Sequence, residues 1–302
     1  MKVVNVIGGL GNQMFQCAFA IALQDAFKHE DVLIDIHHYK YPYPKSFNGN
    51  NYYHNGFEVT KIFNKFPLRE ASPKQVREVS RYIPNYFLSR IARKILPQKS
   101  CEYIQHYLNA YLYDHNVLTD KSKSYFEGYW LSPKYFDFCK NKIIEAFAFQ
   151  PFSTEQNLAY AELLCKDNSV TIHIRRGDYV KASSFKDICT LDYYRKAISE
   201  VRIKIVEPEF FIFSNDQDWC MANLKDEFGD AVVHFVNNNH GSESYRDMQL
   251  MSMARCNILA NSSFSWWGAY LNNRKDKMVY VPKKWVNNLD DRDAYADNWK
   301  KI

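Results

Sequence analysis

The chain has 302 residues, of which 46% are hydrophobic and 24% charged, as in ordinary globular proteins. This length predicts two domains, and a net charge of +5 is too small to indicate a nucleic-acid-binding protein. No apolar run approaches the roughly 20 residues that cross a bilayer, which excludes a membrane-spanning protein. The seven cysteines are scattered without a C-x-x-C pair, so neither a zinc site nor a disulfide framework is expected. A reducing, cytoplasmic compartment fits this pattern best.

The first 40 residues predict a strand, a turn, a helix and a second strand. An apolar run at Val3–Ile7 indicates the first strand, and paired glycines in Gly8–Asn12 indicate a turn. Apolar residues follow helical spacing over Gln13–Phe27, and Val32–Ile36 has the pattern of the second strand. A βαβ unit that opens on a glycine-rich turn commonly lets the backbone approach a ligand.

Residues 40–125 are rich in Tyr, Pro, Asn and Lys and have weak periodicity, so we expect helices and long loops there. One short helix is expected over Tyr86–Leu96, with apolar residues on one face and basic residues elsewhere. Residues 61–100 contain ten Lys or Arg and two Glu. A basic amphipathic helix either lies on an anionic membrane or docks on its own domain, and both interpretations stay open here.

Strands and helices alternate from residue 169 onward. The expected strands are Val170–Ile174, Phe210–Phe213, Val232–Val236, Asn257–Ala260 and Met278–Val281. The expected helices are Asp192–Arg202, Asp218–Phe228, Ser244–Arg255 and Ser265–Leu271. This alternation predicts an α/β fold with two Rossmann-like domains, residues 1–150 and 151–302, that face a central cleft. A ligand is expected in that cleft, outside the carboxyl ends of the strands.

The segment HIRRGD at 173–178 ends an apolar strand in charged side chains. Arg175 and Arg176 repel each other, and guanidinium groups form two-pronged hydrogen bonds with phosphate, so a pyrophosphate is the expected ligand. The alternative is that Asp178 compensates one arginine in a structural ion pair. His173 alternates with apolar strand residues and is either a ligand-binding group or a core histidine.

The segment NSSFSWWGA at 261–269 leads from a strand into a helix. Free backbone N–H groups at a helix N-terminus, with hydroxyl groups beside them, form an anion site that needs no metal. This interpretation selects Asn261, Ser262, Ser263 and Phe264 as ligand-binding residues. The alternative is a serine N-cap followed by two core tryptophans.

The turn at 8–13 is not the G-x-G-x-x-G fingerprint, so it gives little support to a nicotinamide site. Asn12 and Gln13 are uncharged donors suited to sugar hydroxyls or a phosphate oxygen, and their alternative role is to form the turn and cap the helix. Gly9 and Gly11 belong to the same candidate site.

The segment FSNDQDW at 213–219 places Asp216 and Asp218 after a strand. Such a pair can hold Mg²⁺ or Mn²⁺ against a nucleotide-sugar pyrophosphate. The alternative is a helix N-terminus, where acidic residues are favoured by the positive end of the helix dipole.

Five segments, taken in chain order, resemble the α-1,2-fucosyltransferases of glycosyltransferase family 11 over most of the chain. They are GGLGNQMFQ at the start, EGYW at 127–130, HIRRGDY at 173–179, FSNDQDW at 213–219 and ANSSFSWWGAYLN at 260–272. The resemblance implies the two-domain GT-B architecture, GDP-β-L-fucose as donor and a terminal β-galactose as acceptor. It also implies inversion at the transferred sugar and no metal or other cofactor. Two positions depart from the family pattern: Asn215 replaces an acid, and Cys17 replaces a tyrosine.

The resemblance also implies roles for the candidate residues. Arg175 is expected to stabilise the leaving β-phosphate, assisted by His173, Arg176 and the backbone of 261–264. Asp178 is the nearest carboxylate in sequence that can act as the base for the acceptor hydroxyl, and its alternative role is to orient Arg176.

Further donor contacts are expected from both domains. Asn12 is expected to contact fucose or phosphate across the cleft. Asp216, together with Ser214 and Asn215, is expected near the guanine or the ribose. Residues 1–150 are then the acceptor-binding domain and residues 151–302 the GDP-fucose-binding domain.

Two other functions stay open as alternatives. One is a metal-dependent GT-A glycosyltransferase that uses Asp216 and Asp218. The other is a non-catalytic glycan-binding protein that stacks exposed aromatic rings on sugars; aromatic residues make up 16% of the chain.

The resemblance further implies a bacterial enzyme of surface-polysaccharide assembly, with an acceptor carried on a lipid pyrophosphate. We therefore expect a cytoplasmic protein, with a peripheral contact to the inner membrane through residues 61–100 as an additional hypothesis. No nucleic-acid partner is expected.

Overall fold

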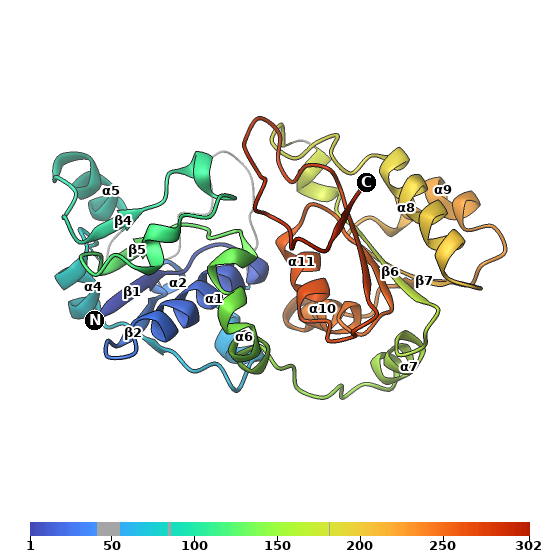
Figure 1. Ribbon diagram of the computed structural model, residues 1–302, viewed down its shortest axis with the longest axis horizontal. Helices are drawn as coiled ribbons and strands as arrows, with labels where there is room; N and C mark the ends of the chain where they lie inside the picture. The colour runs from blue at the N-terminus through green and yellow to red at the C-terminus, as the bar shows by residue number, and fades with distance from the viewer. Residues whose placement is uncertain (41–54, 84–85, 181) are drawn as a thin grey trace. The chain divides into compact units, whose positions relative to one another are not determined.

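The computed structural model describes residues 1–40, 55–83, 86–180 and 182–302, apart from the side chains of residues 86, 87, 90 and 178. The chain divides into two compact units, which Figure 1 shows in the colours of the chain order. Unit 1 consists of Met1–Ala148 and Arg292–Tyr295, and unit 2 of Phe149–Asp291 and Ala296–Ile302. The acceptor-binding and donor-binding roles expected for the two domains stay predictions.

Residues 292–295 belong to unit 1, although the sequence pattern assigns them to the C-terminal domain. Asp293 gives the physical reason. Its carboxylate accepts a hydrogen bond from the backbone N–H of Tyr113 at 3.0 Å and forms an ion pair with Lys134 at 2.6 Å. Contacts between residues so far apart in sequence have no local signature.

Unit 1 is built on a five-stranded parallel sheet with the order β3-β2-β1-β5-β4. Its strands are β1 (Lys2–Asn5), β2 (Val32–Asp35), β3 (Arg69–Glu70), β4 (Glu102–Ile104) and β5 (Tyr125–Glu127). Its α-helices are α1 (Leu10–Ala26), α2 (His37–Lys40), α3 (Val59–Ile62), α4 (Pro73–Val79), α5 (Tyr86–Ile95) and α6 (Lys140–Ala146). Its 3-10 helices are η1 (Tyr107–Asn109), η2 (His115–Leu118), η3 (Pro133–Tyr135) and η4 (Asp137–Cys139).

The expectation of helices and long loops over 40–125 is incomplete, because β3 and β4 lie there and β5 begins at its end. These strands have only two or three residues, which is too short to show a period-2 pattern. Their position comes from pairing instead: Val3 of β1 lies opposite Tyr125 of β5, and Glu102 of β4 lies on the other side of Tyr125.

Helix α1 begins at Leu10, three residues before the predicted start. Gly8 has a φ of +86°, which side chains rarely adopt, and Gly9 is the N-cap residue. Gly11 and Asn12 therefore lie in the first turn of the helix and not in the turn before it. The Asn12 side chain therefore projects from the first turn of α1.

Unit 2 is built on a six-stranded parallel sheet with the order β11-β10-β9-β6-β7-β8. Its strands are β6 (Ser169–Ile174), β7 (Glu209–Ser214), β8 (Val233–Val236), β9 (Cys256–Ile258), β10 (Met278–Val281) and β11 (Lys300–Lys301). Its α-helices are α7 (Glu155–Leu164), α8 (Leu191–Lys204), α9 (Gln217–Leu224), α10 (Tyr245–Met251) and α11 (Ser263–Tyr270). Its 3-10 helices are η5 (Gly177–Val180), η6 (Lys225–Phe228) and η7 (Gly241–Glu243).

Helices cover both faces of the second sheet, because alternate strand residues point to opposite faces. Val170 and Ile172 of β6 pack in one core with α8 and α9, whereas Phe211 and Phe213 of β7 pack in another with α7 and α10. Figure 1 shows α8 and α10 on opposite sides of these strands. The two parallel sheets with their helices confirm the predicted fold class of two Rossmann-like domains, while the central cleft stays a prediction.

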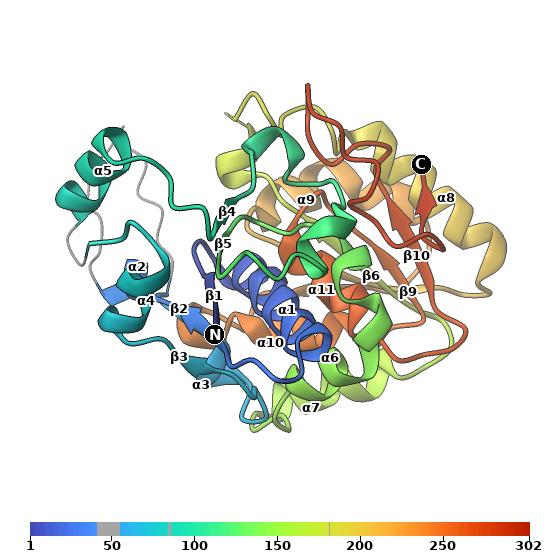
Figure 2. The same ribbon diagram turned by 60° about the vertical axis from the view of Figure 1, so that its left-hand side comes forward.

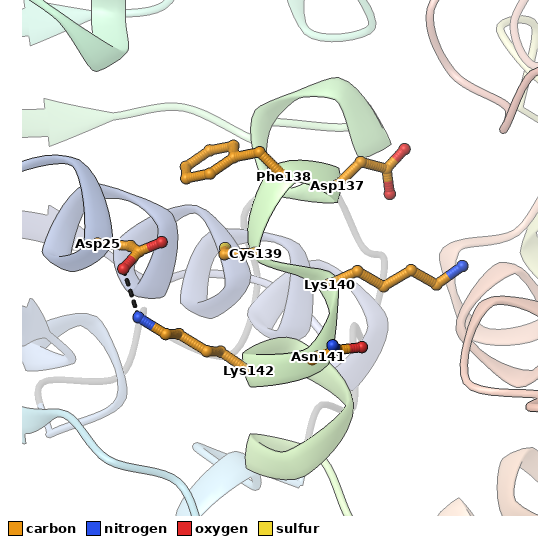
Figure 3. Close-up of a pocket in the computed structure, with 7 residues that line it drawn as sticks. All are labelled: Asp25, Asp137, Phe138, Cys139, Lys140, Asn141 and Lys142. Atoms are coloured by element: carbon orange, nitrogen blue, oxygen red, sulfur yellow. Dashed lines mark hydrogen bonds and ion pairs between the residues drawn. The ribbon is translucent and has the colours of Figure 1, made fainter.

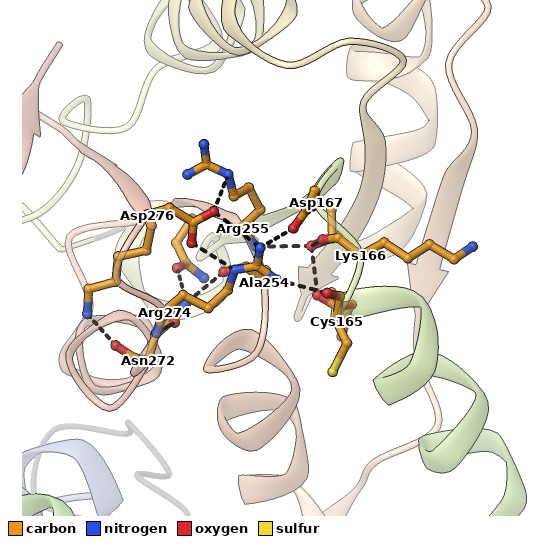
Figure 4. Close-up of polar contacts among 12 residues, drawn as sticks. Cys165, Lys166, Asp167, Ala254, Arg255, Asn272, Arg274 and Asp276 are labelled. Atoms are coloured by element: carbon orange, nitrogen blue, oxygen red, sulfur yellow. Dashed lines mark hydrogen bonds and ion pairs between the residues drawn. The ribbon is translucent and has the colours of Figure 1, made fainter.

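A polar network joins the segments that precede β6, β9 and β10 in unit 2 (Figure 4). The Arg274 guanidinium donates to the carbonyl of Cys165 at 2.8 Å and forms ion pairs with Asp167 and Asp276. Arg255 contacts the same Asp276 carboxylate at 3.0 Å. These contacts tie the amino ends of the central strands together and leave their carboxyl ends for the candidate site.

Candidate functional site at the carboxyl ends of the strands

The carboxyl ends of β9, β6 and β7 lie next to one another in unit 2, because these strands are parallel neighbours. Each strand leads into one of the segments that the sequence analysis singled out. The fold therefore brings the segments at 173–178, 213–218 and 261–264 to the same edge of one sheet.

Arg176 is held by the loop that follows the neighbouring strand β7. Its Nε donates to Asp216 Oδ2 at 3.1 Å, and its guanidinium lies 4.0 Å from the ring centroid of Trp219. The backbone N–H of Arg176 donates to Asn215 Oδ1 at 3.0 Å. The compensating carboxylate for this arginine is thus Asp216, forty residues further along the chain.

Asp216 also forms the start of helix α9. Its Oδ1 accepts a hydrogen bond from the backbone N–H of Trp219 at 3.2 Å, as an N-cap does, and its own N–H donates to Ser214 Oγ at 3.0 Å. Both carboxylate oxygens therefore have protein partners. The contact with guanine expected for Asp216 requires that these partners be shared or exchanged.

Gly177 allows the two loops to meet closely. A Cβ atom at this position would lie 2.3 Å from Asn215 Nδ2, a separation that real side chains do not reach. Asn215 thus positions the end of β6 through its oxygen and packs against Gly177 with its nitrogen. An acid, which is usual in the family at this position, would lack that nitrogen.

Arg175 is half-buried beside its neighbour and has a different environment. Its guanidinium lies 5.5 Å from the ring centroid of Tyr179, and the Tyr179 ring stacks on Phe185 with a centroid distance of 4.7 Å. The side chain of Asp178, the predicted base, lies outside the described part of the structure. Its role stays a prediction.

His173 is a buried imidazole that lacks a partner for one nitrogen. The residue is 7% exposed, and its Nδ1 has no hydrogen-bond partner among the described residues. Burial, reinforced by the charge of Arg175, lowers the pKa of the imidazole to about 3, so the ring is neutral at neutral pH. Its ring packs against Phe264 with centroids 6.0 Å apart. The neutral ring can hydrogen-bond a ligand but adds no positive charge to this edge.

The start of α11 combines one structural residue with one cap. Asn261 is buried, donates to the carbonyl of Trp285 at 2.9 Å and accepts from the Cys189 thiol at 3.4 Å, so its side chain serves the protein interior. Ser262 is the N-cap residue, and its hydroxyl accepts from the N–H of Phe264. Ser263 is partly exposed in the first turn. The backbone N–H groups of this turn remain the anion-binding element that the sequence predicts.

In unit 1, side chains lock the turn at Gly8 in place. Gln13 is fully buried; its Nε2 donates to the carbonyls of Gly8 and Gly56 at 3.0 and 2.8 Å. Its Oε1 accepts from the N–H of Glu58 at 2.9 Å. Gln13 is thus committed to backbone groups, and its observed role is to form the turn. Asn12, one residue earlier, is partly exposed.

Two further residues support the same turn. Gln16 Oε1 accepts from the N–H of Ile7 at 2.8 Å, and the Tyr39 hydroxyl donates to the Gly8 carbonyl at 2.7 Å. The sequence pattern assigns no role to either residue. For Gln16 a signal exists, since it follows Gln13 by three residues and so shares its face of the helix; Tyr39 has no local signal.

The carboxyl ends of β4 and β5 carry exposed aromatic and aliphatic side chains, which we call the aromatic ledge. Its members are Ile104, Tyr107, Leu108 and Tyr129. Gln105 joins its two loops, because Gln105 Oε1 accepts from the N–H of Tyr129 at 3.0 Å and Nε2 donates to the carbonyl of Asn109 at 3.1 Å. The EGYW motif contributes Tyr129 to this ledge.

Other features of the described residues lie apart from this chemistry. A hollow in unit 1 is lined by Asp25 and residues 137–142 and holds none of the predicted site residues; an ion pair between Asp25 and Lys142 lies in it (Figure 3). Within the described ranges, no group of three His, Cys, Asp or Glu is arranged to hold a metal ion. Helices of that part of the chain are also too short or too polar to cross a membrane.

The fold defines a Rossmann-like α/β protein, and at this edge of its second sheet two arginines and the start of α11 follow neighbouring strands. Comparison with known proteins identifies the family: the chain belongs to glycosyl transferase family 11, whose family model matches residues 101–302. The resemblance noted in the sequence is thereby confirmed.

Individual relatives extend the likeness to nearly the whole chain. The chain is 31% identical to the alpha-1,2-colitosyltransferase of Escherichia coli, with 99% of this chain and 98% of that protein aligned. It is 30% identical to the O-antigen biosynthesis glycosyltransferase WbnK of Escherichia coli, over 97% of each. It is 28% identical to galactoside alpha-(1,2)-fucosyltransferase 2 of Rattus norvegicus, over 48% of this chain and 43% of that protein.

Among solved structures, apo POFUT1 aligns with a TM-score of 0.46 at 12% identity, over 94% of this chain and 98% of that one. The fucosyltransferase NodZ from Bradyrhizobium aligns with a TM-score of 0.45 at 12% identity, over 88% and 90%.

Proposed function

We propose that this glycosyltransferase transfers L-fucose from GDP-β-L-fucose to the 2-hydroxyl of a terminal β-galactose. The transfer inverts the configuration at the sugar carbon and needs no metal ion. The observation that carries this proposal is the pair of arginines that follows the end of β6, at the same sheet edge as the start of α11; Asp216 holds Arg176 there, and Arg175 is half-buried beside it. Family membership and the names of the relatives support the reaction class.

The chemistry explains why charge is needed at this edge. The oxygen O2 of galactose forms a bond to C1 of fucose while the bond from C1 to the β-phosphate oxygen breaks, and the O2 proton passes to a base. The departing GDP gains negative charge, which Arg175 is suited to stabilise through two-pronged hydrogen bonds. Backbone N–H groups at the start of α11 supply further donors.

Three neighbouring residues complete the proposed donor site. His173 would satisfy its orphaned nitrogen with a hydrogen bond from or to the donor. Arg176 and Asn215 would hold the loop in the conformation that aims Arg175. Asp178 remains our assignment for the base that accepts the O2 proton.

Unit 1 is proposed to bind the acceptor. The aromatic ledge offers flat rings at the carboxyl edge of the first sheet, and the apolar faces of sugar rings pack well on such surfaces. Asn12 is proposed to hydrogen-bond the donor sugar or phosphate. The E. coli relative named for O-antigen biosynthesis supports an acceptor that is carried on a lipid-linked polysaccharide precursor.

Colitose is the second candidate for the transferred sugar. The relative at 31% identity over 99% of the chain is a colitosyltransferase, and colitose is L-fucose without its 3-hydroxyl. Transfer of colitose from its GDP derivative is therefore the second candidate function. The metal-dependent and purely glycan-binding alternatives are not favoured, since Asp216 already has partners and the family is one of transferases.

The donor proposal is tested by GDP release. Purified protein is given GDP-L-fucose or GDP-colitose at equal concentration, with and without a β-galactoside. We expect acceptor-dependent GDP release that is faster with GDP-L-fucose. Faster release from GDP-colitose would make GDP-colitose the donor in place of GDP-L-fucose. If neither donor releases GDP, the proposal is overturned.

A further inference from the structure

Helix α5 has an arrangement of side chains opposite to that of an ordinary surface helix. Leu88, Ile91 and Ile95 are 52%, 51% and 73% exposed, whereas Ser89 and Ala92 are each only 7% exposed. Large apolar side chains thus face outward and small ones face the protein. We call the exposed residues Leu88, Ile91, Ile95 and Leu96 the apolar stripe; the spacing of the first three places them on one side of the helix, and Leu96 follows directly after its last residue.

Ion pairs fix the orientation of α5, so the stripe cannot simply rotate inward. Arg93 forms an ion pair with Glu127 of β5 at 2.6 Å. Arg81 forms an ion pair with Glu102 of β4 at 2.8 Å and donates to the carbonyl of Leu96 at 3.1 Å, just past the end of the helix. The helix is therefore anchored on its inner side. In both views of the protein α5 lies at the margin of unit 1 (Figures 1 and 2).

The surroundings of the stripe are positively charged. Lys94 is exposed on the same helix and has no ion-pair partner among the described residues. Residues 61–100 carry ten Lys or Arg against two Glu, and one of those two, Glu70, pairs with Lys40 outside the segment. Lys61, Lys65 and Lys74 are exposed as well. An exposed apolar stripe with a cationic border is complementary to an apolar layer beneath an anionic surface.

We propose that the apolar stripe of α5 docks unit 1 on an anionic lipid bilayer. The helix lies in the plane of the interface with Leu88, Ile91, Ile95 and Leu96 among the acyl chains, at a depth of about 5–10 Å, as amphipathic helices do. Lys94 and the neighbouring basic residues contact the phosphate groups of the lipids. The positive border favours this occupant over an apolar groove of a second protein. The proposal does not depend on which sugar the enzyme transfers.

The test is flotation of the full chain with lipid vesicles, without donor or acceptor present. Vesicles of phosphatidylcholine with about a third phosphatidylglycerol are compared with pure phosphatidylcholine, at low and high salt. Wild-type protein should float with the anionic vesicles, and high salt should reduce the bound fraction, because charge screening weakens contacts at the lipid surface. Equal flotation with neutral vesicles, or none with either, would overturn the proposal.

Three variants locate the contact. The triple variant Leu88→Ser, Ile91→Ser and Ile95→Ser should lose at least tenfold in vesicle partition. The control Ile203→Ser with Val206→Ser removes two apolar residues of unit 2 that are even more exposed, at 81% and 85%, and should bind as wild type does. The charge variant Lys94→Glu should bind several-fold less, which keeps the test independent of any effect of the triple variant on folding. Binding as tight as that of wild type by both the triple variant and Lys94→Glu would overturn the proposal.

Light scattering distinguishes binding to a bilayer from association of two copies of the chain. If the stripe joins two copies of the chain, wild type is a dimer, the triple variant is a monomer and neither binds vesicles. That set of results would replace the bilayer by a second copy.

Discussion

The guanidinium of Arg176 lies 4.0 Å from the ring centroid of Trp219, and its Nε donates to Asp216 two residues after the end of the neighbouring strand. This contact separates the roles of two adjacent arginines. Arg176 ties the loop after β6 to the loop after β7 and to the start of α9. Arg175, beside Tyr179, is left as the proposed phosphate-binding group.

The first prediction concerns this division of roles. Arg175→Ala should lower kcat by about two to three orders of magnitude, because a donor aimed at the charge of the leaving group is lost. Arg175→Lys should recover part of this, since an ammonium keeps the charge without the planar fork. Steady-state kinetics with GDP-fucose measure both, and Arg195→Ala, which removes an exposed arginine paired with Glu227, is the matched control. An unchanged kcat for Arg175→Ala would reject its role.

The second prediction concerns the close approach of Gly177 and Asn215. Gly177→Ala places a methyl group where Asn215 Nδ2 lies, so the asparagine must move and its bond to the N–H of Arg176 is lost. We expect GDP affinity to fall about tenfold, or ~1.4 kcal/mol, comparable to one lost hydrogen bond.

A double-mutant cycle by calorimetry tests this coupling. In an Asn215→Ala background the obstacle is absent, so Gly177→Ala should add almost nothing to the loss. Simple additivity of the two losses would contradict the geometry.

The third prediction distinguishes a turn-forming role of Gln13 from a donor-binding role. Gln13→Ala leaves the carbonyls of Gly8 and Gly56 and the N–H of Glu58 without their side-chain partner. Stability should fall by about 1–3 kcal/mol, seen as a lower Tm. The KM for GDP-fucose of the folded variant should change little. A raised KM with an unchanged Tm would instead make Gln13 a ligand of the donor.

The fourth prediction is a pH dependence of stability. Burial raises the pKa of Asp247 from 3.8 to about 7, although Asn239 donates to its Oδ1 at 2.8 Å. The folded protein then holds this proton more tightly than the unfolded chain. The corresponding stabilisation is complete below about pH 3.8 and decreases as pH rises toward 7, above which it is lost.

Thermal unfolding of wild type and Asp247→Asn between pH 5 and 8.5 measures this effect. Asn cannot ionise, and its oxygen can still accept from Asn239. The gain in Tm of the variant over wild type should increase as pH rises from 5 to about 7 and should stay constant above that. A constant difference across the range would show that Asp247 does not titrate there.

Much of unit 2 could be predicted from the sequence, because β6 and β7 are mostly apolar runs of six residues that alternate with periodic helices. Strand β11 could not be predicted, since it is the exposed pair Lys300–Lys301. Unit 1 was harder to predict, since β4 and β5 are only three residues long and take their place from pairing with β1 and with each other. In the candidate site, too, local features could be predicted and contacts that depend on strand order could not. The charged end of β6 is visible in HIRRGD, but the partner of Arg176 depends on the strand order, which places β7 beside β6.

The sequence leaves two roles open for Gln13, a ligand of a sugar or phosphate and a turn-forming residue, and does not decide between them. Its type and position suit a ligand of a sugar, yet the fold brings the backbone of residues 56 and 58 within reach of its amide. A buried amide satisfied by distant backbone groups has no local signature in the sequence.

The central claim is best tested by the structure of the product. GDP-β-L-fucose and lactose are incubated with the purified protein, with and without EDTA, and the linkage of any trisaccharide is assigned by NMR. We expect fucose α-linked to O2 of galactose, in equal yield with and without the chelator. A different linkage or anomer, loss of product with EDTA, or a protein that neither forms product nor binds GDP would contradict it.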